Sequence, residues 1–119
     1  MTTSGLIGRT DALFPNVYHF TQKSEWLLGL DKRLWEELIS RYEGASEPLW
    51  DNSSSDRELL LGEEYSELYI CYLSMLMELY SGNITGYQNK AALFNSHYLS
   101  FMNSFNRSHL MKRVNINIE

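Results

Sequence analysis

The sequence predicts an all-α protein, a small helical bundle of about three main helices with a long acidic loop and an extended C-terminal arm. Three stretches place apolar residues every three or four positions, the spacing that lines one face of an α-helix. Strand-like alternation is confined to the last few residues. The 119 residues amount to one domain, which we divide into an N-terminal segment (1–20), a helical core (21–106) containing the loop (45–61), and the arm (107–119).

The first two predicted helices lie on either side of the loop. The first runs from an N-cap at Thr21 to Gly44, a residue type that commonly follows a helix end. Its apolar residues are Trp26, Leu27, Leu30, Leu34, Trp35, Leu38, Ile39 and Tyr42. The second begins at Glu63 or Glu64, where acidic side chains suit the positive end of the helix dipole, and ends at Gly82. Its apolar residues are Tyr65, Leu68, Tyr69, Tyr72, Leu73, Leu76, Leu79 and Tyr80.

The third predicted helix has a continuous apolar seam with alternating steps of three and four residues. The seam consists of Ile84, Tyr87, Ala91, Phe94, Tyr98, Phe101 and Phe105. Gly82 and Gly86 leave two alternatives for its junction with the second helix, a short hairpin turn or a kinked continuous helix, and we favour the turn. We expect Trp35, Tyr72 and Phe94 to be buried. In the N-terminal segment, residues 11–15 (Asp-Ala-Leu-Phe-Pro) have two alternatives, a short helical turn or an arm packed on a neighbouring subunit.

The predicted loop (45–61) contains Pro48, a polar run from Asp51 to Asp56, and almost no core-forming residues. We therefore expect a long exposed loop, and loops of this length in compact domains are usually functional or disordered. Its apolar tip, Leu49 and Trp50, has two alternative roles. It docks on a partner or folds back on the core of the domain.

Charge is distributed unevenly along the chain. Residues 43–67 contain eight acidic side chains and one base, Arg57, whereas residues 84–119 contain four bases and one acid, Glu119. The acidic middle is a poor nucleic-acid surface, because affinity for phosphates comes from Lys and Arg. The simplest interpretation is a solvated acidic loop. Head-to-tail contact between identical subunits is the alternative.

Residues typical of catalysis, metal binding or cofactor binding are missing from the sequence. The three histidines are far apart, and Gly5 to Gly8 lacks the glycine pattern of a phosphate loop. Neighbouring acids such as Glu36 and Glu37 point about 100° apart on a helix, so they do not converge on a substrate. Cys71 is the single cysteine and fits a core position. We predict no enzyme activity, no cofactor or metal, no secretion and no membrane span.

The C-terminal arm ends in residues 114–118, Val-Asn-Ile-Asn-Ile, which alternate like a β-strand. A single strand leaves its backbone donors and acceptors unpaired, so it needs the edge of another sheet. Because the rest of the chain is predicted to be helical, that edge would belong to a partner. Arg107, Lys112 and Arg113 would then face an acidic partner surface. A frayed polar tail is the alternative.

Three runs of the sequence resemble a family of small proteins from the structural gene modules of tailed phages and prophages of Gram-positive bacteria. The runs are "NVYHFTQKSEWLLGLDKRLWEELISRYEG", "ELLLGEEYSELYICYLSMLMELYSGNITGYQNKAALFN" and "NRSH". The shared features are an Asn-x-Tyr entry, a Trp-Leu-x-x-Leu-Asp helix, a variable acidic loop, a Glu-Leu-Tyr helix, and then Ala-Leu-Phe-Asn and Asn-Arg-Ser/Thr-His. Leu110 and Met111 stand where a Met-Pro type ending is expected.

This resemblance implies a virion structural protein, a head-tail connector that joins capsid to tail as a ring of twelve copies below the portal. Implied partners are the portal protein, a neighbouring connector, stopper or tail protein, and other copies of the chain, with DNA passing nearby without sequence-specific binding. Portal contacts would fall to the arm residues Arg107, His109, Lys112, Arg113, Val114, Ile116 and Ile118. Loop contacts would fall to Trp50, Asp51 and Asp56. The implied location is the virion neck, after assembly in the host cytoplasm.

Two other functions remain open from the sequence. One is a different role in the same phage module, as a tail-completion protein or an assembly chaperone. The other is a small enzyme or regulator whose site lies in surface residues that form no known motif.

Overall fold

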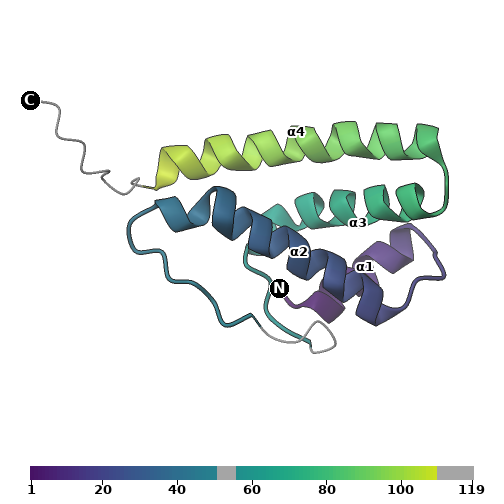
Figure 1. Cartoon of the computed structure of the whole chain (residues 1–119), viewed down its shortest axis with the longest axis horizontal. Helices are drawn as coiled ribbons and strands as arrows, with labels where there is room; N and C mark the ends of the chain where they lie inside the picture. The colour runs from purple at the N-terminus through teal and green to yellow at the C-terminus, as the bar shows by residue number, and fades with distance from the viewer. Residues whose placement is uncertain (51–55, 110–119) are drawn as a thin grey trace, which may run out of the picture.

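The computed structural model describes residues 1–50 and 56–109, which form four α-helices and two short 3-10 helices. The α-helices are α1 (Thr3–Leu13), α2 (Phe20–Glu37), α3 (Ser66–Tyr80) and α4 (Ile84–Ser108). The 3-10 helices are η1 (Ile39–Arg41) and η2 (Glu63–Tyr65). Helices α3 and α4 run antiparallel as a hairpin, and α2 and α1 pack beside it (Figure 1). The prediction of an all-α fold is confirmed, with four helices instead of about three.

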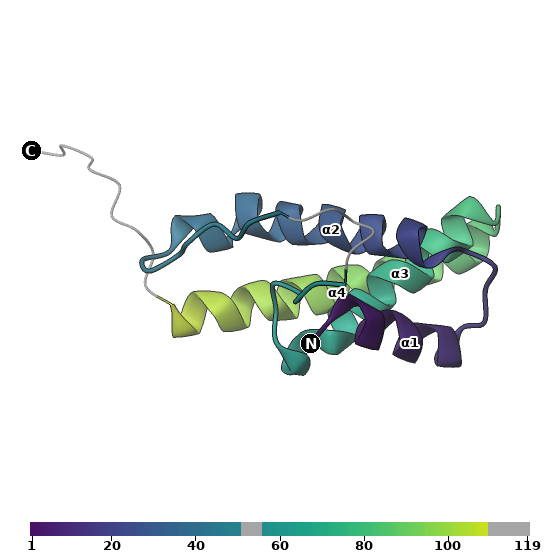
Figure 2. The same ribbon diagram turned by 90° about the horizontal axis from the view of Figure 1, so that it is seen from below.

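Helix α3 is the centre of the bundle. It contacts each of the other three helices, and Figure 2 shows α2 and α1 on opposite sides of it. Its buried residues therefore surround the helix instead of forming one stripe, as expected for a helix in the middle of a core. They are Leu68, Tyr69, Ile70, Cys71, Leu73, Ser74, Met75 and Met77. The predicted start at Glu63 or Glu64 coincides with η2, which leads directly into α3.

Helix α1 lies in the N-terminal segment, for which the sequence predicted no structure. Thr2 caps it by accepting a hydrogen bond from the Gly5 amide at 3.2 Å. One face of the helix is buried, at Thr3, Leu6, Ile7 and Thr10. Glycine and threonine are poor helix formers and two of the four buried positions are polar, so the helix has a weak amphipathic pattern. Tertiary contacts stabilise it.

Helix α2 is shorter than the sequence predicted. It begins at Phe20 with His19 as the N-cap, and not after Thr21. It ends at Glu37 and is followed by η1, after which the chain turns at Gly44 with a φ of 79°. The expected burial of Trp35 is wrong, because its side chain is half-buried at the edge of the bundle and lies outside the core. Tyr72 is partly buried against the core.

The junction between α3 and α4 is the hairpin turn that the sequence favoured. Gly82 adopts a φ of 82°, in the left-handed region that glycine enters without steric cost. Asn83 then caps α4, its side-chain oxygen accepting from the Gly86 amide at 3.0 Å. Along α4, Phe94, Tyr98 and Phe101 are buried, in agreement with the predicted seam, whereas Ile84, the first residue of that seam, is 59% exposed.

The loop prediction is correct at one end and wrong at the other. Leu49 is 92% exposed, as expected for the tip. Leu59 and Leu61, which were predicted to lie in an exposed loop, are each only 6% exposed and belong to the core. The reason is that the chain returns to the helices from Asp56 onward, as described next.

Candidate functional site

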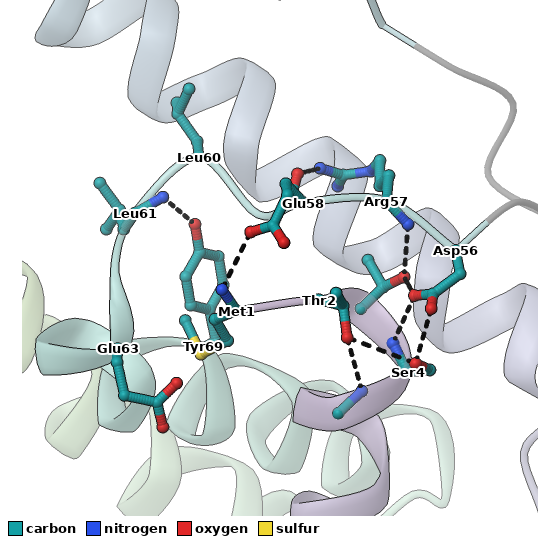
Figure 3. A network of polar contacts seen from close by, with 12 residues as sticks. Met1, Thr2, Ser4, Asp56, Arg57, Glu58, Leu60, Leu61, Glu63 and Tyr69 are labelled. Carbon is teal, nitrogen blue, oxygen red and sulfur yellow. Dashed lines mark hydrogen bonds and ion pairs between the residues drawn. The ribbon is translucent and has the colours of Figure 1, made fainter.

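Residues 56–61, which we call the return segment, join the N-terminus to the helices. The amide of Thr3 donates to the carbonyl of Arg57 and the amide of Leu59 donates to the carbonyl of Met1, both at 2.9 Å. These bonds form an isolated antiparallel bridge between Thr2 and Glu58. The terminal ammonium of Met1 also pairs with the Glu58 carboxylate at 2.9 Å (Figure 3).

Asp56 binds the first turn of α1. Its carboxylate accepts from the Thr3 hydroxyl at 2.8 Å, from the Ser4 amide at 2.9 Å and from the Ser4 hydroxyl at 2.8 Å (Figure 3). These donors, the Ser4 amide foremost, lower the pKa of the Asp56 carboxyl below its usual value. The sequence predicted that Asp56 contacts a partner. Its oxygens already have donors within the chain, and the partner contact stays a prediction.

Asp31 is fully buried at the centre of a second polar network. Its Oδ1 accepts from the Tyr69 hydroxyl at 2.5 Å, and its Oδ2 accepts from Arg57 Nη1 at 2.7 Å and from the Leu60 amide at 3.1 Å. The Tyr69 hydroxyl in turn accepts from the Leu61 amide at 3.0 Å (Figure 3). The network thus connects α2, α3 and the return segment.

Burial dominates the acid-base properties of this network. It raises the pKa of the Asp31 carboxyl above its usual value, and the hydrogen bonds from Tyr69 and Arg57 oppose that shift. Burial and the neighbouring Asp31 carboxylate raise the pKa of the Tyr69 phenol well above its usual range. Both oxygens of Asp31 are occupied by donors, so the arrangement holds the chain together and leaves no free carboxylate oxygen for chemistry.

The guanidinium of Arg57 is only partly used. Its Nη1 donates to Asp31 and, at 3.2 Å, to the Glu58 carbonyl. Its Nε and Nη2 are buried and have no hydrogen-bond partner among the described residues. Arg57 also contributes to a hollow of about 310 Å³ that is lined by Asp31, Pro48, Leu49, Trp50, Arg57, Glu58, Leu59 and Leu60.

Trp50 lines the same hollow as Arg57. Its side chain is half-buried and is not part of the core. The indole nitrogen donates to Glu47 at 3.0 Å, a local bond that does not tie the loop to a helix. Asp51, the other predicted loop contact, falls outside the described residues.

A groove of about 490 Å³ lies where α4 ends. It is lined by Ile39, Tyr42, Glu43, Gly44, Ala45, Leu60, Leu61, Gly62, Glu64, Tyr65, Phe101, Phe105, Ser108 and His109. The His109 ring stacks on Phe105 with centroids 3.7 Å apart, and Tyr42 contacts Phe105 edge-on at 4.8 Å. The Tyr42 hydroxyl is buried and has no partner among the described residues. Five of the fourteen lining residues are aromatic and two, Glu43 and Glu64, carry carboxylates, and we call this groove the aromatic groove.

Two of the predicted arm residues lie in the described part of the chain. Arg107 belongs to α4, which continues to Ser108, so it is helical and not part of an extended arm. Arg107 and His109 also line different surfaces. His109 borders the aromatic groove, whereas Arg107 borders a hollow of about 280 Å³ with Glu64, Glu67 and His97. The remaining predicted arm residues, Lys112, Arg113, Val114, Ile116 and Ile118, fall outside the described residues.

Sequence analysis missed the Asp31, Arg57 and Tyr69 network, although two signals pointed to it. Asp31 occupies the apolar face of the first predicted helix, at the spacing of Leu27 and Leu34, where a charge requires a partner. Arg57 is the single base among the acids of residues 43–67. Pairing the two would have predicted that the end of the loop folds back.

Among the side chains in residues 1–50 and 56–109, no three potential metal ligands are grouped closely enough to hold an ion. No helix in the same part of the chain is long and apolar enough to cross a membrane. Comparisons with protein-family models, with curated proteins and with solved structures find no match to this chain.

Proposed function

We propose that this protein is a subunit of the head-tail connector of a tailed phage or prophage, assembling as a ring below the portal and joining capsid to tail. One observation carries the proposal. The loop and the arm, which such adaptors use to reach their neighbours, both depart from the rim of one aromatic groove. Gly44 and Ala45 at the start of the loop line this groove together with His109, the last described residue before the arm.

The motifs behind the resemblance also meet in space. The last residue of the Trp-Leu-x-x-Leu-Asp motif is Asp31, and the last residue of the Glu-Leu-Tyr motif is Tyr69. Their side chains form the 2.5 Å hydrogen bond at the centre of the buried network. Phe94 of the Ala-Leu-Phe-Asn motif is 2% exposed and packs against Tyr72 with centroids 5.2 Å apart. The shared residues therefore specify one bundle, which supports a common fold with that family.

Exposed apolar side chains support assembly into a ring. Ile84, Leu93 and Leu99 on α4 are 59%, 50% and 60% exposed, and Tyr80 at the hairpin turn is 62% exposed. The three residues on α4 are distributed around the helix instead of forming one stripe, which suits a subunit with a neighbour on each side. In this proposal ring formation buries them.

The test is electron microscopy of the purified protein mixed with the portal protein encoded in the same gene module. A ring added below the portal, with density running from the end of α4 onto the portal, would support the connector function. A variant lacking residues 114–119 is the matched control and should add no ring. Failure of the intact chain to associate with the portal would contradict the proposal.

Mass spectrometry of purified particles separates the connector from the assembly roles. A connector is found in finished virions at about the stoichiometry of the portal. A chaperone is present during assembly and absent from finished particles. Absence from particles would therefore shift the proposal to an assembly factor of the same module.

A further inference from the structure

Helix α4 has a long exposed face on the side away from the bundle. The helix packs along α3, and Figure 1 shows no other helix of the described chain over its opposite side. We call the exposed residues between Thr85 and Asn106 the outer face. They are Thr85, Gln88, Asn89, Ala92, Leu93, Asn95, Ser96, Leu99, Ser100, Asn103 and Asn106.

The outer face carries no charge on any of these eleven described residues. Helix α2 provides the comparison, because five of its eight exposed residues are charged. They are Glu25, Lys32, Arg33, Glu36 and Glu37. A helix face that stays in water normally carries charges, whereas the core of a protein–protein interface is depleted of them.

Helix stability does not account for the residue types on the outer face. Seven of the eleven residues are Asn, Ser or Thr, which are weaker helix formers than Lys, Glu or Arg. Leu93 and Leu99 are 50% and 60% exposed on the same face. The face therefore combines exposed apolar area with neutral hydrogen-bonding groups, a composition that suits contact with another protein surface.

The chemistry of the outer face fits a second copy of the same chain. Amide and hydroxyl side chains both donate and accept hydrogen bonds, so the face is complementary to itself. A charged partner surface would lose its hydration here without gaining an opposite charge. In a two-fold contact the same patch lies on both sides, and an uncharged patch brings no like charges together.

The length of α4 sets the strength of such a contact. Its 25 residues span about 37 Å. One pair of helices covers less area than a standard stable interface, so the contact should be weak and reversible. An antiparallel arrangement is favoured over a parallel one, because it places opposite ends of the two helix dipoles next to each other.

We propose that two copies of the free chain associate through the outer faces of α4, antiparallel about a two-fold axis near Ser96. Ser96 is the middle residue of α4, so full overlap of the two helices places it at the axis. The proposal does not depend on the connector function. Ring assembly would bury Leu93 and Leu99 as well, so the pair must open before a ring forms.

The first test is sedimentation of the full chain across a wide range of concentration. The chain should be a monomer when dilute and a dimer when concentrated, and added salt should not weaken the dimer, because no ion pair holds it. Ser96→Arg places two like charges at the axis and should weaken association at least tenfold. Thr21→Arg, at an exposed residue of α2, makes the same change in net charge and should leave association unchanged.

The second test measures the geometry by thiol crosslinking with a short bis-maleimide. The Ser96→Cys variant should crosslink to itself, whereas the parent chain should not, because its single cysteine, Cys71, is buried. Thr85→Cys and Asn106→Cys lie near opposite ends of the outer face. In an antiparallel pair they should crosslink only when the two variants are mixed. Circular dichroism checks that each variant folds.

Four results would overturn the proposal. A chain that stays monomeric at every concentration would show that the outer face does not bind a second copy. A dimer that Ser96→Arg leaves intact, or that salt dissociates, would place the contact on another surface. Crosslinking of Thr85→Cys to itself would indicate a parallel pair. A dimer that forms only after residues 110–119 are removed would show that those residues occupy the outer face.

Discussion

At the scale of the residue, Asp31 connects three parts of the bundle, α2, α3 and the return segment. It provides acceptors for α3 through Tyr69 and for the return segment through Arg57 and the Leu60 amide. A buried ion pair contributes little over an apolar pair of the same shape, but loss of one partner leaves the other charge buried and uncompensated. The effect of a substitution is therefore asymmetric.

Asp31→Asn should destabilise the protein by about 3 to 5 kcal/mol, because Arg57 stays buried without its counter-ion. Circular dichroism monitors unfolding in urea, and the midpoint and slope of the transition give the free energy of unfolding. Glu36→Gln, at an exposed acid on the same helix, is the control and should change the stability by less than about 0.5 kcal/mol. A loss for Asp31→Asn as small as that of the control would mean that Arg57 reaches solvent.

The contact between Glu37 and Tyr98 connects α2 to α4 and depends on pH. The Tyr98 hydroxyl donates to Glu37 at 2.7 Å, and this bond, followed by the charge of Arg33, lowers the pKa of the Glu37 carboxyl below 4.5. A lowered pKa in the folded state adds stability that is complete above pH 4.5 and is lost as the pH falls through the lowered value. Protonation of Glu37 should therefore weaken the α2–α4 contact in acid.

Tyr98→Phe should raise the pKa of Glu37 toward its ordinary value and flatten the dependence of stability on pH below 4.5. The measurement is a carboxyl ¹³C NMR titration of both proteins, with urea unfolding at several acidic pH values. Asp56 is an internal control, since its carboxyl lies in a different network and should keep its lowered pKa in the variant. An unchanged Glu37 titration would show that Arg33, and not Tyr98, sets its pKa.

At the scale of the element, the α3–α4 turn depends on one backbone conformation. Gly82→Ala should cost about 1 to 2 kcal/mol, because a φ of 82° places a Cβ in the left-handed region. Gly29→Ala provides the matched comparison. Gly29 is exposed inside α2 with open space around it, and the same substitution should stabilise the protein by about 0.5 to 1 kcal/mol. Thermal unfolding of both variants measures the difference, and shifts of the same sign would contradict this account.

Prediction from the sequence succeeded for elements whose stability comes from an apolar pattern. The buried part of the α4 seam and the turn at Gly82 are local features, so spacing and residue type identify them. On α3 the spacing identified the helix but not its buried surface, because Leu79 and Tyr80 are exposed while Ile70 and Met75 are buried. Helix α1 was missed because its buried face includes the polar residues Thr3 and Thr10, which interrupt the apolar pattern. Contacts with residues distant in the sequence stabilise this helix. The sequence predicted that α2 extends past Tyr42, because Tyr42 continues the apolar spacing. The helix instead ends earlier, and η1 (Ile39–Arg41) lies between its end and Tyr42.

The candidate site was less predictable than the fold. Asp31 and Arg57 are 26 residues apart, and their pairing depends on a return of the loop that no local pattern encodes. The aromatic groove combines residues from η1, the return segment, η2 and α4. Sequence reasoning identified the loop and the arm as functional candidates, but it could not show that both depart from one groove.

At the scale of the whole molecule, the four-helix bundle should not depend on the last residues of the chain. The core consists of residues between Leu6 and Phe101. Deleting residues 114–119 should therefore leave the helical circular dichroism signal and the melting temperature nearly unchanged, while abolishing attachment to the portal. A loss of helical signal on deletion would instead mean that these residues pack in the core of the domain.

The pairing of the N-terminus with the return segment also affects the order in which the newly made chain can fold. Thr3 and Asp56 are 53 residues apart, so α1 leaves the ribosome well before the carboxylate that binds its first turn. At about 5 to 20 residues per second, synthesis of the intervening chain takes roughly 3 to 10 seconds. During that interval α1 lacks both Asp56 and its main neighbour, the later α3. Helix α1 is therefore synthesised before α2, α3 and α4 but is completed only after Asp56 and α3 have emerged.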